Sequence, residues 1–222
     1  MRRKSNLDER LKSCDHHLIL VEGGEFYKKT EEEKYRILSL SEIFKNDNEV
    51  YLDLGCGNGE FSLSSAKNYP EKNFIGVEKI SNVLIVGAER AKEENPNNCA
   101  FLNCAVENLN YYLPKNSISG IFLNFSCPYP KGTYKKRRLT HPRFLSLYTY
   151  LLKDGGTISL KTDSEDFFEF SKENLLSCDY IIDFETRDLY GSAEITDNIS
   201  TEYERHFLEI GKKILKLVAR KP

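Results

Sequence analysis

The 222-residue sequence lacks several features that would restrict its class. It has no long apolar run, so we expect no membrane-spanning segment. Its charged N-terminus leads into no apolar stretch, unlike a secretory signal. No cysteine pair has CxxC spacing, and no histidine is spaced to complete a zinc site. We therefore expect free thiols in a reducing cytoplasm, no metal and no membrane partner.

The sequence also lacks an excess of charge of one sign. It has 32 basic and 34 acidic residues, a net charge of -2, so any nucleic-acid partner must meet a local basic patch. Tryptophan is absent, but there are 13 tyrosines. A content of 40% hydrophobic and 30% charged residues is typical of a soluble globular domain. Residues 1–30 lack a clear period and are interpreted as an N-terminal extension to a domain of residues 31–222.

Short apolar runs that predict strands alternate with helical patterns along the chain. We predict strands at 49–54, 73–78, 99–104, 118–125 and 157–163, and near 179–187 and 205–219. We predict helices from Thr30 to about Phe44 and at 60–69, 81–95, 142–152 and 164–177. The alternation predicts an α/β fold with a mostly parallel seven-stranded sheet, helices on both faces and one antiparallel strand near the end. Ligands of such folds bind at the carboxyl ends of the strands.

A glycine loop follows the first of these strands. Asp53 precedes Gly55, Gly57 and Gly59, a pattern that differs from the GxGxxG dinucleotide fingerprint. An acid before the loop repels phosphate but suits an amino group, and Glu78 ends the second strand where it suits a ribose diol. An adenine nucleoside with a cationic tail and no phosphate, such as S-adenosylmethionine, fits this set. The alternative is a structural glycine turn with two solvated acids.

These features resemble the class I methyltransferases over about residues 48–165, which implies their Rossmann-like fold. A closer resemblance begins at the fourth strand. The run from Asn124 to Lys131, followed by Lys135 to Thr140, resembles the tRNA (guanine-N7)-methyltransferase family, which has Phe-x-Asp-Pro-Trp-x-Lys and then His-x-Lys-Arg-Arg. "KTD" at 161–163 and "TEYERHF" at 201–207 match two later family motifs in order and spacing.

The resemblance implies methyl transfer from S-adenosylmethionine to N7 of a guanine in tRNA, at position 46 of the variable loop. It implies a cofactor site formed by Asp53, Gly55, Gly57, Gly59, Glu78, Cys104, Ala105, Asn124 and Cys127. It implies a substrate site formed by Lys131, Lys135, Arg137, Arg138, Asp163, Thr201, Tyr203 and Glu204. Among these, Asp163 and Glu204 are the carboxylates expected to read the donors of guanine. The chain is expected to be a monomer or a homodimer.

A basic run is expected to meet the phosphate backbone of the RNA. It consists of Lys131, Lys135, Lys136, Arg137, Arg138 and Arg143. Cations beside a helix N-terminus oppose the helix dipole, so an anionic partner explains the run better than a solvated helix start.

The sequence departs from the family pattern at three positions. Cys127 replaces the aspartate that is taken to be catalytic in the family, Tyr129 replaces a tryptophan, and Cys104 replaces an aspartate near the adenine. Three interpretations of Cys127 follow: a tolerated substitution, a tRNA-binding protein that has lost catalysis, or a cysteine nucleophile. Guanine N7 has no proton to remove, which favours the first. A methyltransferase of the same fold with another substrate is a further alternative.

Overall fold

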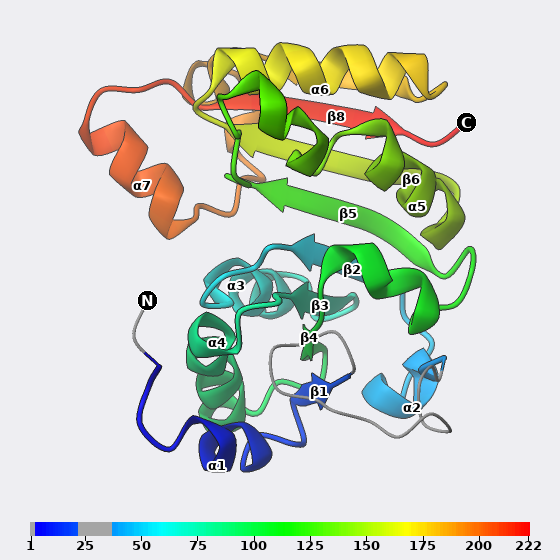
Figure 1. Ribbon diagram of the computed structural model, residues 1–222, viewed down its shortest axis with the longest axis vertical. Helices are drawn as coiled ribbons and strands as arrows, with labels where there is room; N and C mark the ends of the chain where they lie inside the picture. The colour runs from blue at the N-terminus through cyan, green and yellow to red at the C-terminus, as the bar shows by residue number, and fades with distance from the viewer. Residues whose placement is uncertain (1–2, 22–36) are drawn as a thin grey trace. The chain divides into compact units, whose positions relative to one another are not determined.

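The computed structural model describes residues 3–21 and 37–222, which divide into two units, residues 1–114 and 115–222 (Figure 1). Each unit contributes four strands within the described residues, so the described strands number eight instead of the predicted seven. None of the helices in these stretches is long and apolar enough to cross a membrane.

The first unit has a parallel arrangement of strands in the order β1-β4-β3-β2. The strands are β1 (Leu18–Leu20), β2 (Val50–Leu54), β3 (Asn73–Val77) and β4 (Cys99–Asn103). Every residue of β3 and β4 is buried, as the apolar runs of parallel strands predict. The connecting helices α3 (Glu60–Asn68) and α4 (Ser81–Glu94) pack on β3 and β4, so the predicted alternation is confirmed here.

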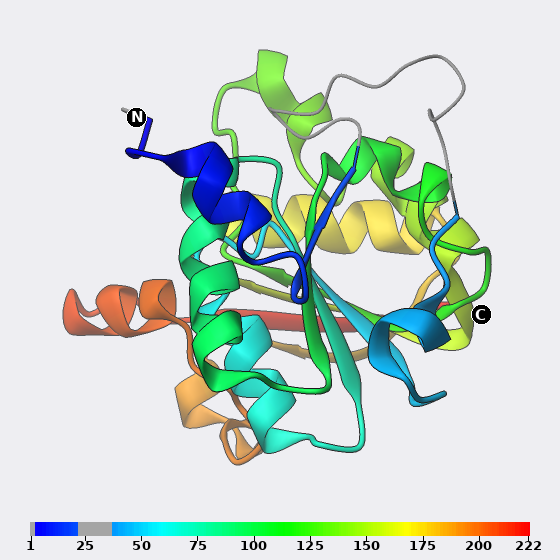
Figure 2. The same ribbon diagram turned by 90° about the horizontal axis from the view of Figure 1, so that it is seen from below.

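The described part of the N-terminal segment is packed against this unit. Helix α1 (Leu7–Lys12) lies beside α4 (Figure 2), where Arg10 forms two bonds of 2.6 and 2.7 Å with Glu89. Strand β1 pairs with β4 and is the strand that the sequence did not predict. The predicted domain boundary after residue 30, and the predicted helix start at Thr30, lie outside the described residues. Helix α2 (Leu40–Phe44) ends where predicted.

The second unit has the strand order β5-β6-β8-β7. Its strands are β5 (Ile118–Asn124), β6 (Leu152–Thr162), β7 (Ile181–Thr186) and β8 (Leu215–Arg220). Strand β6 is parallel to β5, whereas β8 is antiparallel to both β6 and β7, which confirms the predicted antiparallel strand. Helices α5 (Pro142–Leu151) and α6 (Glu165–Ser177) match the prediction, and α6 packs on β6, β7 and β8.

The predicted strand at 205–219 is wrong in its first half. Residues 202–209 form helix α7 (Glu202–Glu209), and β8 begins only at Leu215. Thr201 caps α7 by accepting the N–H of Glu204 at 3.1 Å. Thr-x-x-Glu is the capping-box pattern of a helix start, and it is the signal that the strand prediction overlooked.

Short 3-10 helices complete the described structure. They are η2 (Val106–Tyr111), η3 (Gly132–Arg137), η4 (Leu189–Gly191) and η5 (Ala193–Ile195).

Candidate functional site

In the first unit, the glycine loop between β2 and α3 has an open face. Gly55 and Gly57 have φ values of 75° and 59°, and a Cβ atom on either would meet no atom of the described residues within 4 Å. Gly59 differs, because its Cβ would lie 2.5 Å from the ring of Phe101. The loop is therefore packed at its α3 end and open at its β2 end, where a ligand can approach the backbone.

Two carboxylates accompany this loop. Asp53 is buried in β2 and accepts the Ser62 hydroxyl at 2.8 Å, so it lies beneath the loop. Glu78 follows β3 and is half-buried, with one oxygen accepting the N–H of Ile80 at 2.8 Å. Parallel β2 and β3 place both acids at the same end of the strands. Asp53, Gly55, Gly57, Gly59 and Glu78 are called the glycine-loop cluster below.

The cysteines of this unit are neutral thiols. Burial raises the pKa of Cys56 well above its ordinary value, and the charges of Asp53 and Glu78 raise it further. Burial likewise raises the pKa of Cys104 to about 12, with a smaller effect of Glu107. The Cys104 thiol donates to the carbonyl of Ala105 at 3.1 Å. It therefore supplies no anionic acceptor where the family has a carboxylate.

In the second unit, the carboxyl end of β5 holds polar atoms without partners. Both atoms of the Asn124 side-chain amide, and the hydroxyl of Ser126, are buried and have no hydrogen-bond partner among residues 3–21 and 37–222. The backbone here is also strained, because Phe125 and Tyr129 have φ values of 49° and 40°. Unsatisfied buried groups are costly, and strain of this kind clusters at ligand sites. This strand end therefore has the features of a ligand site.

Cys127 lies in the same loop and is exposed. Its thiol is thus accessible to a ligand at the end of β5. Cys104 and Cys56 differ from it in this respect, since their thiols are buried or half-buried.

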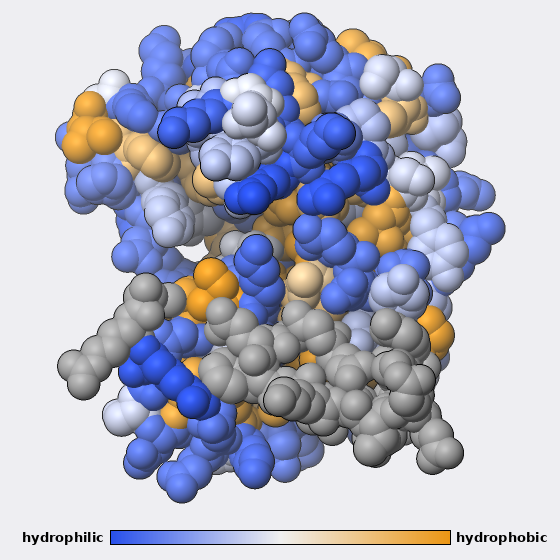
Figure 3. Space-filling view, viewed as in Figure 1, coloured by the Kyte–Doolittle hydropathy of each residue, from blue (hydrophilic) through white to orange (hydrophobic). Residues whose placement is uncertain are grey.

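The basic run divides into exposed and buried members. Lys131, Lys135 and Arg137 are exposed, and Arg137 lies 4.7 Å from the ring centre of Tyr134. Their segment, which includes η3, lies on the mostly hydrophilic face of the second unit seen in Figure 3. Arg138 is different: its side chain has no exposed surface and forms an ion pair with Asp166. The expectation that Arg138 contacts phosphate stays a prediction, and in this structure its guanidinium does not reach the surface.

Glu204 also differs from its expected role. It is fully buried in α7 and accepts hydrogen bonds from Lys161 at 2.6 Å, Asn198 at 2.5 Å and Tyr190 at 3.0 Å. Lys161 in turn donates to the carbonyl of Ile199 at 2.8 Å. A carboxylate with these partners is a link between β6, α7 and the preceding loop. The expectation that Glu204 reads guanine directly stays a prediction.

Asp163 remains as a carboxylate at the end of β6. Its side chain is 17% exposed and pairs with Lys212. Thr201 is mostly buried as the cap of α7, so its hydroxyl is committed to the N–H of Glu204. Of the predicted substrate residues on these elements, Tyr203 is exposed and Asp163 is partly exposed.

An aromatic stack joins α7 to the end of β5. Tyr203 is 62% exposed and stacks on Phe125, with ring centres 6.4 Å apart and an angle of 22° between the rings. Phe207, one turn further along α7, also contacts this ring, with ring centres 5.5 Å apart. Figure 3 shows hydrophobic surface over α7. Ile210, the residue that follows α7, is 56% exposed. The sequence prediction named Tyr203 but missed Phe125 and Lys161, although both stand inside the quoted motifs.

Within the described stretches, no group of three or more histidine, cysteine, aspartate or glutamate side chains is placed to hold a metal ion.

Comparison with known proteins gives the family. The family model described as "Putative methyltransferase" matches residues 47–217. The tRNA (guanine-N(7)-)-methyltransferase of Clostridioides difficile (strain 630) is 38% identical over 178 residues, which cover 80% of this chain and 83% of that protein. The protein of the same name from Clostridium acetobutylicum is 39% identical over 178 residues, 80% of this chain and 84% of that protein.

The chain belongs to the tRNA (guanine-N7)-methyltransferase family.

Solved structures of methyltransferases share the fold. An antibiotic-related methyltransferase has a TM-score of 0.62 at 21% identity and covers 90% of this chain and 98% of its own. A 16S rRNA methyltransferase has a TM-score of 0.62 at 13% identity with the same coverage. The predicted α/β, class I methyltransferase fold is thereby confirmed.

The departures from the tRNA (guanine-N7)-methyltransferase pattern fall in different surroundings. Cys104 is buried and bonded within its own turn, whereas Cys127 is exposed on a strained loop. Tyr129, at the family's tryptophan position, is half-buried, and its carbonyl accepts from Arg138 at 3.4 Å. Of the three, Cys127 is the departure with an exposed side chain.

Proposed function

We propose that this protein transfers a methyl group from S-adenosylmethionine to N7 of a guanine in tRNA, in the variable loop. The observation that carries the proposal is the 37–39% identity to curated proteins of that name, over about 80% of the chain. The matched stretch contains both the glycine-loop cluster and the β5 strand end.

The glycine-loop cluster fits the cofactor. The open face at Gly55 and Gly57 leaves room for a ligand against the backbone, and the Asp53 and Glu78 charges disfavour a phosphate there. Glu78 has its second oxygen for a ribose hydroxyl, and Asp53 beneath the loop supplies negative potential for an ammonium group. Asn124, in the second unit, stays a predicted cofactor contact, and both atoms of its side-chain amide are buried without a partner among the described residues. A phosphoethanolamine N-methyltransferase of Haemonchus contortus, with a TM-score of 0.53, was solved with S-adenosyl-L-methionine.

When bound, S-adenosylmethionine supplies an electrophilic methyl group on a sulfonium. Guanine N7 is a lone-pair acceptor, so no side chain has to remove a proton from it before attack. The residues of the site then act by positioning the base, excluding water and offsetting the positive charge that the base gains. Cys127 is compatible with such a reaction, since the reaction requires no proton transfer to or from its side chain.

The second unit offers groups suited to a guanine. The exposed Tyr203 ring, backed by Phe125, provides a face on which a base can stack. Asp163 can accept from guanine N1–H and its amino group, while Lys212 balances its charge when the base is absent. Lys131, Lys135 and Arg137 are exposed for phosphate contacts.

One assay tests the proposal. The purified protein is incubated with methyl-labelled S-adenosylmethionine and an unmodified tRNA transcript, and the product nucleosides are separated. We expect 7-methylguanosine that maps to the variable loop. Absence of 7-methylguanosine at stoichiometric enzyme, under conditions where the tRNA is bound, would contradict the proposal.

That same result would support a second function, a tRNA-binding protein without catalysis. Cys127 at the family's aspartate position is the observation that favours it. Label in a different nucleoside or in a small molecule would instead indicate another substrate. A small-molecule substrate would not require the exposed basic residues.

A further inference from the structure

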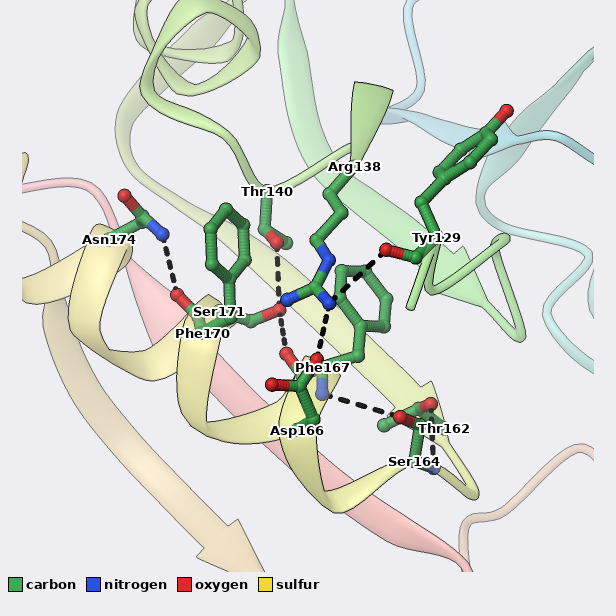
Figure 4. Close-up of polar contacts among 10 residues, drawn as sticks. All are labelled: Tyr129, Arg138, Thr140, Thr162, Ser164, Asp166, Phe167, Phe170, Ser171 and Asn174. Carbon is green, nitrogen blue, oxygen red and sulfur yellow. Dashed lines mark hydrogen bonds and ion pairs between the residues drawn. The ribbon is translucent and has the colours of Figure 1, made fainter. Parts of the chain in front are cut away.

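The Arg138 side chain lies between the loop after β5 and helix α6 (Figure 4). Its guanidinium is fully buried and pairs with Asp166 in the first turn of α6. The same nitrogen, Nη2, donates to the carbonyl of Tyr129 at 3.4 Å. One side chain thus connects the loop after β5 to the start of α6.

Two phenylalanines of α6 complete the site. The guanidinium lies 4.6 Å from the ring centre of Phe170 and 5.8 Å from that of Phe167. A planar guanidinium can stack on such rings while it donates in its own plane, which an ammonium group cannot do. Thr140, two residues further on, adds a bond of 2.7 Å to the Ser171 hydroxyl of α6. The segment after Arg138 is therefore fixed to the same helix.

The buried guanidinium of Arg138 is an unfavourable way to stabilise the fold. Nε and Nη1 of Arg138 are buried with no acceptor among the described residues. A buried cation with unpaired donors is less favourable than an apolar side chain of similar volume. The Arg138 side chain contacts a loop in which two residues, Phe125 and Tyr129, have positive φ values. Such conformations persist only where their surroundings fix them.

We propose that Arg138 is a positioning residue, which holds the loop of residues 125–131 against α6 and so fixes Cys127 and Lys131 relative to Asp163. The catalytic part of this inference rests on the proposed function. Arg138 therefore acts through the loop, in contrast to its neighbour Arg137, whose exposed side chain acts on the RNA.

Hydrogen exchange tests the loop directly and requires no activity. Asp166→Asn keeps an acceptor but removes the charge that pairs with Arg138, and Arg138→Lys keeps the charge but removes the planar fork. Glu165→Gln is the matched control, because Glu165 is adjacent on α6 and pairs at 2.6 Å with the exposed Arg187. We expect faster amide exchange in a peptide covering 122–134 for Asp166→Asn and Arg138→Lys, and wild-type exchange for Glu165→Gln. Wild-type exchange in both test variants, or an equal effect of Glu165→Gln, would overturn the inference.

Kinetics then separate positioning from general stability. At a temperature where unfolding curves show every variant to be folded, Asp166→Asn and Arg138→Lys should lower kcat by on the order of 10²-fold, since small misplacements have effects of that size. Their tRNA Kd should stay within about threefold of wild type, whereas Arg137→Gln should raise Kd. Unchanged kcat in the test variants would overturn the catalytic part. If the wild type transfers no methyl group, the proposed function fails, and the exchange result still decides what Arg138 holds.

Discussion

At the scale of single residues, the main question is whether the site requires a carboxylate at the position of Cys127. Cys127 is exposed on a strained loop at the position of a family aspartate. Because N7 carries no proton, a carboxylate there has no proton to take from the base. The surrounding amide of Asn124 and the nearby Asp163 are left as polar groups that can orient the substrate.

We therefore predict small effects of substitutions at Cys127. Cys127→Ala and Cys127→Asp should keep kcat for tRNA methylation within about tenfold of wild type, whereas loss of an essential acid or base typically lowers rates by about 10²–10⁴-fold. Single-turnover rates with bound cofactor measure this directly. Loss of activity in Cys127→Ala would show a required thiol, and a large gain in Cys127→Asp would show a missing carboxylate.

The Lys161–Glu204 pair leads to a prediction about stability. Glu204→Gln leaves the buried Lys161 ammonium without a counter-charge, so we expect a loss of about 3 kcal/mol in the free energy of unfolding. Glu169→Gln is the control, since its pair with Arg187 is exposed and should contribute below about 1 kcal/mol. Urea denaturation measures both. If both variants lost a similar, small free energy of unfolding and only Glu204→Gln lost guanine binding, Glu204 would contact guanine directly.

Residue types and spacing were sufficient to identify these motifs. They did not predict which of the side chains are exposed. Arg137 and Arg138 are adjacent and chemically identical, yet one is on the surface and the other is buried against α6. The burial of Glu204 was likewise not predictable from the sequence. Its family motif indicated a functional residue, and only the position of Lys161 shows that its carboxylate faces inward.

At the scale of elements, the loop between β2 and α3 carries the cofactor assignment. Gly55→Ala should reduce affinity for S-adenosylmethionine strongly, because the new Cβ enters the open face of the loop at a φ of 75°. Gly155→Ala is matched for strain, since Gly155 has a φ of 73° and its Cβ would have no atom of the described stretches within 4 Å. It lies in the first half of β6, away from the loop.

Calorimetric titration with S-adenosylmethionine, alongside thermal unfolding, tests this pair. Both variants should lose similar stability, on the order of 1 kcal/mol for an alanine at positive φ, but only Gly55→Ala should lose affinity. Equal affinities for S-adenosylmethionine in the two variants would contradict the assignment of the cofactor site to this loop.

The buried strands and the helices between them followed from apolar runs of the right length, as β2 to β5 show. Strand β6 was predicted from 157 onward, but it begins at Leu152. Elements that depend on partners far along the chain did not. Strand β1 is three residues long and exists through its pairing with β4. Helix α7 has a polar sequence whose helical signal is its capping box, next to an apolar run that belongs to β8.

At the scale of the whole molecule, a net charge of -2 means that tRNA binding has to arise from a local patch. Lys135→Gln and Arg137→Gln should each weaken tRNA binding and reduce the slope of log K against log salt by about one. Filter binding between 50 and 200 mM salt measures the slopes. Lys153→Gln, an exposed residue at the start of β6, is the control. A slope unchanged in the two test variants would place the RNA on another surface.

The central claim is that N7 of a tRNA guanine accepts the methyl group, and one measurement addresses that atom. Two transcripts of the same tRNA are compared with methyl-labelled S-adenosylmethionine, one with guanine and one with 7-deazaguanine, in which carbon replaces N7. The account predicts label in the guanine transcript and none in the 7-deazaguanine transcript, with both bound equally well. Equal labelling of the two transcripts would contradict it.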